Sequence, residues 1–330
     1  MVRKFKFNFF VFLICFDIIS ATIILGFFGG SFLTNHLLLD LSGYFLVLFL
    51  AVFAAYFAER AGIINIAIEA FLIFGGLIFA LVSNITTSVL LGFLIVLISG
   101  LIFSLFFTWI VVFLKSDQVI AGTALNIFIF GIATFFVNKN FGKIDVNYEF
   151  KTKYLVFVYF LVSLLFFVVV WYVYRKTKFG LWQRAIGENP HVAESAGINV
   201  IKQRVIAVLL SGLTATVAGV FFVISQSGIA FHGTVNGTGF IAIAILLVSQ
   251  RKIMKIPIFS FLFASVFIIA VAIVPFLEVP SHDGFKREII SFLKENKTLF
   301  LALPFVFSLF ILALTSKRKM NQPLFLGKKW

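Results

Sequence analysis

Two carboxylates in this sequence stand where a charge is costly, and they are the first candidates for chemistry. Asp17 and Glu69 lie within long apolar runs, where a charged side chain costs about 2.5–3.5 kcal/mol on membrane-insertion scales. Asn65 precedes Glu69 by four residues, a spacing that puts both on one face of a helix. We expect Asn65 and Glu69 either to line a polar translocation path or to brace a broken helix against a neighbour. We expect Asp17 to pair with another helix.

Two further stretches carry polar groups beside apolar runs. Asn126 follows small residues at 121–124, which permit close backbone approach; its amide either bonds across a helix interface or faces solute. The glycine-rich loop 233–239 suits a chain that re-enters protein at membrane depth. Phe240 begins the apolar run after this loop. We count Phe240 with Asn65, Glu69 and Asn126 as candidates for a translocation path.

The sequence does not carry the residue patterns of the common hydrolytic enzymes. Its histidines fall in four separate loops and form no HxxxH or HExxH pair for a metal, and no GxSxG nucleophile turn is present. Cys15 is the only cysteine, which excludes an intrachain disulfide and a thiolate metal site. A GxxxxGK[ST] phosphate loop is also missing. We therefore expect no enzyme activity, metal or cofactor, with any ATP used by a partner; an intramembrane hydrolase is the minor alternative.

One polar segment, residues 180–200, separates two long apolar runs and carries its own helix punctuation. Asn189 suits an N-cap, Pro190 suits the first helical position, and Gly197 suits the position just past the end. This pattern predicts a short helix over about 190–196, outside the membrane. A short capped helix between two membrane spans is suited to binding another protein.

Composition indicates the elements that must position these residues. Hydrophobic residues make up 62% of the 330 and charged residues 12%, against about 45–50% and about 25% in soluble domains. We predict an all-α polytopic membrane protein with a single transmembrane domain, 1–330. Its ten spans are expected at 9–29, 43–58, 62–82, 88–114, 119–137, 154–174, 205–225, 238–249, 256–277 and 298–315.

Several of these spans have irregular features. The first is too long for a typical signal peptide and lacks a small-residue cleavage site, so we interpret it as a retained span. The second and eighth are short. The third contains polar residues, and it and the eighth are candidates for broken or half-crossing helices. Continuous helices are the alternative for both.

Charge supports an even number of crossings. With ten spans and an inner N-terminus, nineteen Lys and Arg fall on the inner side and eight on the outer side, where seven acids accompany them. This asymmetry follows the positive-inside rule. It places both termini and the segment 175–204 in the cytoplasm. The net charge of +14 therefore reports orientation, and nucleic-acid binding is not expected because no basic soluble module is present.

With these motifs in hand, the chain resembles the permease subunits of ABC importers in the branched-chain amino acid and ribose permease superfamily, and most of all the nucleoside (simple sugar-type) branch. The resemblance rests on the blocks 58–71 (AERAGIINIAIEAF), 116–134, 180–200 (GLWQRAIGENPHVAESAGINV) and 237–252, and on the tail 321–329. Ala70 stands where the family usually has glycine, and Ser249-Gln250 replaces an expected Gly-x before Arg251. These departures concern helix packing and hence solute identity more than class.

The resemblance implies a working assembly. Residues 175–204 would be a coupling loop that binds a cytoplasmic ABC ATPase through Glu188, Asn189, Pro190, Glu194 and Gly197. A second permease subunit, either a related chain or a copy of itself, and an extracytoplasmic solute-binding lipoprotein would complete a nucleoside importer in the bacterial inner membrane. Import of ribose, another sugar or an amino acid is the alternative within the family. An ion-coupled secondary transporter is the alternative outside it, although we find no convincing internal repeat.

Overall fold

The computed structural model describes residues 35–140, 144–145, 152–225, 230–276, four single positions between 306 and 313, and 322–328. The helices in these ranges are α2 (Asn35–Arg60), α3 (Ile68–Thr86), α4 (Val89–Thr108), α5 (Gln118–Lys139), α6 (Thr152–Lys176), α7 (Lys178–Glu188), α8 (Pro190–Ser195), α9 (Val200–Ser225), α10 (Thr238–Val248) and α11 (Ile256–Phe276). A π-helical turn, η1 (Trp109–Phe113), continues α4, and a 3₁₀ turn, η2 (Ile253–Lys255), precedes α11. The strands β1 (Ile144–Asp145) and β2 (Ala230–Phe231) form one short antiparallel pair.

Six of these helices are long and apolar enough to cross a membrane: α2 to α6, with η1 continuing α4, and α9. By contrast, α10 has 11 residues, which at 1.5 Å per residue span about 16 Å of a hydrocarbon core about 30 Å thick. The expected eighth span is therefore too short to cross the hydrocarbon core as one continuous helix, which favours the half-crossing alternative. The expected first span, with Asp17, and nearly all of the tenth lie outside the described residues.

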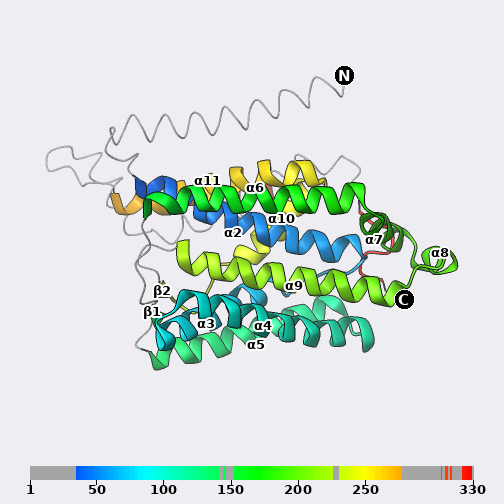
Figure 1. Ribbon diagram of the computed structural model, residues 1–330, viewed down its shortest axis with the longest axis horizontal. Coiled ribbons are helices and arrows are strands. Elements are labelled where there is room, and N and C mark those ends of the chain that lie inside the picture. Colours follow the sequence, from blue (N-terminus) through cyan, green and yellow to red (C-terminus); the bar gives the residue numbers. More distant parts are fainter. Residues whose placement is uncertain are drawn as a thin grey trace, which may run out of the picture.

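Helix α2 forms the centre of the bundle and is almost completely buried. Figure 1 shows α6 and α11 on one side of α2 and α9 on the other, with α3, α4 and α5 beyond α9. The prediction of a short second span at 43–58 is wrong, because α2 continues at both ends through polar residues. Ser42 donates to the carbonyl of Leu39 (3.0 Å), and Glu59 is paired with Arg251. Because these polar side chains have hydrogen-bond or ion-pair partners, the helix can extend beyond the apolar run.

Small residues set the distance between α3 and α9. A Cβ atom added at Gly219 of α9 would collide with the carbonyl of Leu72, and one added at Gly75 of α3 would collide with the carbonyl of Thr216. Without a hydrophobic driving force between helices in lipid, this close backbone contact supplies van der Waals attraction. The α3–α9 contact thus depends on glycine at these positions.

This contact yields a test with a matched control. Gly219→Ala must push α9 away from α3, and we expect it to lower stability by about 1–3 kcal/mol, the usual cost of overpacking. Gly131 of α5 has nothing within 4 Å of an added Cβ, so Gly131→Ala should leave stability unchanged or raised. Thermal unfolding of the detergent-solubilised chain measures both. Equal melting temperatures for the two variants would contradict the packing interpretation.

Candidate translocation and coupling site

The chain between α2 and α3 is not helical although it is mostly buried. After a turn at Gly62 (φ 81°), residues 63–66 run without regular structure, and α3 begins only at Ile68. Two side chains of α5 replace the missing helical hydrogen bonds. Gln118 Oε1 accepts from the backbone of Ile64 (2.7 Å), and Asn126 Nδ2 donates to the carbonyl of Ile66 (3.0 Å). Irregular backbone inside a membrane protein is tolerated only where such partners exist.

Asn126 also caps α3. Its Oδ1 accepts from the backbone N–H of Ala70 (2.9 Å), in the first turn of a helix whose own N-cap residue, Ala67, makes no side-chain cap. Both ends of the Asn126 amide therefore bind backbone of the neighbouring element. Of the two roles open from sequence, this geometry is that of the bond across a helix interface. Gly122, one turn earlier, meets Ile66 and Ala67 closely enough to allow it.

The predicted pairing of Asn65 and Glu69 on one helical face is wrong. Asn65 precedes the helix, because the polar groups of α5 compensate the backbone that a helix would otherwise have satisfied. Its Nδ2 donates to Ser211 Oγ of α9 (2.8 Å), while its buried Oδ1 has no hydrogen-bond partner among the described residues. Asn65 and Glu69 therefore point to different neighbours.

Glu69 binds the start of α10. The carboxyl group is 7% exposed, and its Oε1 and Oε2 accept from the backbone N–H groups of Gly237 (2.9 Å) and Gly239 (2.6 Å). A helix N-terminus presents unpaired N–H donors and positive potential, both of which a carboxylate satisfies. Gly237 has φ 75° and no capping side chain, and a Cβ at Gly239 would lie 2.5 Å from the backbone of Glu69. The glycines of the loop 233–239 thus let α10 begin against Glu69.

The first turn of α10 also contains Thr238 and Phe240. Thr238 is buried and lies 3.2 Å from the hydroxyl of Tyr44, which fixes the start of α10 against α2. Phe240 is 44% exposed. Of the four candidate path residues, the structure therefore gathers Asn126 and Asn65 at the α2–α3 interruption and Glu69 at the start of α10, with Phe240 on the outer surface of that helix.

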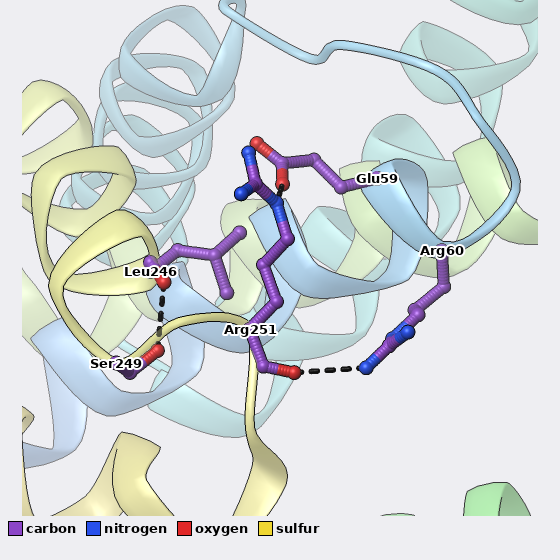
Figure 2. A network of polar contacts seen from close by, with 5 residues as sticks. All are labelled: Glu59, Arg60, Leu246, Ser249 and Arg251. Atoms are coloured by element: carbon purple, nitrogen blue, oxygen red, sulfur yellow. Dashed lines mark hydrogen bonds and ion pairs between the residues drawn. The ribbon is translucent and has the colours of Figure 1, made fainter. Parts of the chain in front are cut away.

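The other end of α10 is held by a buried ion pair that sequence reasoning missed. Arg251 Nε lies 2.5 Å from Glu59 Oε2, and Arg60 Nη2 donates to the carbonyl of Arg251 (2.9 Å). Figure 2 shows Arg251 reaching from the end of α10 to both residues at the end of α2. Ser249, one of the family departures, donates to Leu246 (2.7 Å) and closes the last turn of α10. The sequence alone did not indicate this pair, because Glu59 and Arg251 are 192 positions apart and each looks like an ordinary charged residue of a loop.

The second half of the polar segment 180–200 folds as its punctuation predicts, whereas the first half belongs to α7, which was not predicted. The short helix α8 spans Pro190–Ser195, with Asn189 Oδ1 accepting from the backbones of His191 (3.1 Å) and Val192 (3.3 Å). Gly197 has φ 79° and donates to the carbonyl of Glu194 (2.9 Å). The predicted helix is confirmed.

The five residues assigned to ATPase coupling divide into two groups. Pro190 is buried and Asn189 half-buried, so they build α8, as Gly197 does through its conformation. Glu188 and Glu194 are exposed. Figure 1 shows α7 and α8 projecting from one end of the bundle. The acidic pair is therefore accessible to another protein.

Comparison with known sequences defines the class. The profile of the family described as branched-chain amino acid transport system / permease component matches residues 37–312. The chain belongs to this family: it is the permease component of an ABC transporter, a multi-pass protein of the bacterial membrane.

Individual relatives narrow the branch. The protein MG121 of Mycoplasma genitalium is 34% identical over 295 residues, 81% of this chain and 88% of its own length. The nucleoside ABC transporter permease NupC of Lactococcus lactis is 29% identical over 78% of this chain and 85% of its own length. The guanosine ABC transporter permease NupQ of Bacillus subtilis is 29% identical over 61% and 70%. No solved structure matches significantly.

The Glu69 contact predicts a graded loss of stability. Glu69→Ala leaves the buried N–H of Gly239 and the partly buried N–H of Gly237 without acceptors, which costs about 1–3 kcal/mol for the buried group and less for the other. Glu69→Gln keeps one acceptor and should fall between. Thermal unfolding and membrane accumulation measure the effect, with Glu188→Gln, an exposed carboxylate, as the control. A Glu69→Ala chain that melts like the unaltered protein would show that the contact with α10 does not brace the fold.

Proposed function

We propose that this chain is the transmembrane subunit of an ATP-driven importer of nucleosides. Ten spans with both termini in the cytoplasm, and a cytoplasmic coupling loop at 175–204 within a single domain, give the arrangement that the charge asymmetry favours. A separate ABC ATPase, a second permease subunit and an extracytoplasmic binding lipoprotein complete the assembly. The observation that carries the proposal is the capped helix α8 at the end of a permease bundle, with the exposed carboxylates of Glu194 within it and of Glu188 at the end of α7.

The translocation path, in this proposal, passes the junction of the α2–α3 interruption with α10. Asn65 supports this assignment, since its buried Oδ1 is an acceptor with no hydrogen-bond partner among the described residues. Phe240 is exposed at the start of α10, where an aromatic ring can stack on a base. Glu69 and Asn126 shape the junction through the backbone bonds described above.

The same junction favours a neutral solute. Discontinuous helices in transporters commonly direct their N-termini at anionic groups of the substrate. Here both carboxyl oxygens of Glu69 already accept from the first N–H groups of α10. An incoming carboxylate or phosphate would find those donors occupied. Nucleosides and simple sugars carry no such charge, whereas amino acids do.

Coupling can be tested on the acidic pair formed by Glu188 at the end of α7 and Glu194 in α8. Glu188→Ala with Glu194→Ala removes two exposed charges but keeps the Asn189 cap, so the helix should persist. We expect ATPase attachment and ATP-driven uptake to fall by about tenfold or more, the loss typical of truncated charged contacts. Lys139→Ala, an exposed charge at the opposite end of the bundle, is the control. Copurification of the ATPase measures attachment, and unchanged attachment and uptake would contradict the coupling role.

Solute class can be tested by competition. In proteoliposomes holding the whole assembly, an unlabelled nucleoside should suppress uptake of the labelled one, whereas its 5′-monophosphate and neutral amino acids should not. A ligand screen of the binding lipoprotein decides between nucleoside and sugar. Equal competition by the monophosphate would contradict the argument from Glu69.

A further inference from the structure

The residues near the C-terminus, 322–328, lie between two elements far apart in sequence. The backbone N–H of Phe325 donates to the carbonyl of Gly187 at the end of α7 (3.0 Å), and that of Gly327 donates to the carbonyl of Gly62 (3.0 Å). Gly187 adjoins α8, and Gly62 begins the interrupted segment between α2 and α3. We call residues 322–328 the tail. It joins the coupling helices to the interruption by one hydrogen bond on each side.

Side chains strengthen both contacts of the tail. The ring of Phe325 meets that of His191 in α8 edge to face, with centroids 5.9 Å apart, and Lys328 Nζ lies 5.2 Å from the Phe325 ring centroid. Pro323 is buried. Gly327 has φ 73°, and a Cβ there would come within 2.7 Å of the Ile64 side chain. The left-handed φ of Gly327 therefore favours glycine where the tail meets the interrupted segment, and an added Cβ would also press on the end of the Ile64 side chain.

The end of α7 also contacts the end of α2 directly, without the tail between them. A Cβ at Gly187 would lie 2.5 Å from the carbonyl of Arg60, so the end of α7 abuts the end of α2 directly. Arg60 in turn donates to Arg251 at the end of α10. The end of α7 is thus connected through these contacts to the end of α2, which leads into the interrupted segment, and to Arg251 just beyond α10.

We propose that the tail is a positioning element that transmits movement of α7–α8 to the α2–α3 interruption and so to the translocation path. This inference rests on the proposed function. Its basis is that the tail bonds to backbone of both elements at once, whereas an element that only stabilised α8 would need no bond to Gly62. Among the described residues, two backbone hydrogen bonds hold the tail to the rest of the chain outside its own turn, so we expect the packed helices to persist when the tail is removed.

The test compares three forms of the chain in proteoliposomes that contain the ATPase, the second permease and the binding protein. A chain ending at Gln322 lacks both tail contacts. We expect the ATPase to remain attached and ATP hydrolysis to continue, while uptake per ATP falls by about tenfold, in the range that changes along a coupling route produce. Gly327→Ala, which opposes the contact with Ile64, should act in the same direction. Leu324→Ala is the matched control, because that tail side chain is 69% exposed.

The outcomes separate the tail's role from the alternatives. Unchanged uptake per ATP in the truncated chain and in Gly327→Ala would overturn the inference. Loss of ATPase attachment in the truncated chain and in Leu324→Ala would overturn it as well, because the tail would then be a binding surface. Failure of both Gly327→Ala and the truncated chain to accumulate would reduce the tail to a stabilising brace. Absence of ATP-driven uptake by the unaltered assembly would contradict the proposed function itself.

Discussion

A backbone polar group surrounded by lipid and protein must find its partner inside the protein, and this requirement organises the bundle. Two elements have backbone groups without partners in their own secondary structure, the irregular segment after α2 and the start of α10. Polar side chains that are costly in a membrane supply the missing hydrogen bonds. The amides of Gln118 and Asn126 bind the irregular segment, and the carboxyl group of Glu69 binds the start of α10. These bonds place α5 and α10 against α3, so the fold depends on the same polar residues that first suggested a path.

Helix α10 illustrates how such a constraint becomes a mechanism. Its start is held by Glu69 and its end by Glu59 through Arg251. Removing one partner of a buried ion pair is far more damaging than replacing both, so neither Glu59 nor Arg251 can be lost alone without cost. The two contacts tie α10 to α3 at its start and to α2 at its end. Arg251 also contacts Arg60, which lies beside the end of α7, so the proposed path and the helices α7 and α8 belong to one connected network.

The sequence predicted the parts whose signals are local. Asn189, Pro190 and Gly197 sufficed for α8, and the apolar run near 238–249 correctly indicated that α10 would be short. Contacts between residues far apart in the chain could not be predicted from the sequence, because no local pattern links Glu59 to Arg251 or Gln118 to Ile64. The helical spacing of Asn65 and Glu69 misled for a related reason, since side chains of α5 made a non-helical backbone stable at Asn65. At an interrupted helix, residue periodicity no longer predicts the backbone conformation, because hydrogen bonds from neighbouring elements determine it.

We propose that ATP hydrolysis by a partner drives nucleosides through this permease. The most direct measurement is accumulation of a labelled nucleoside in proteoliposomes that hold the permease pair, the ATPase and the binding lipoprotein. We expect accumulation with ATP and none with a non-hydrolysable analogue or with a sodium or proton gradient alone. Accumulation driven by an ion gradient without ATP, through this chain by itself, would contradict it.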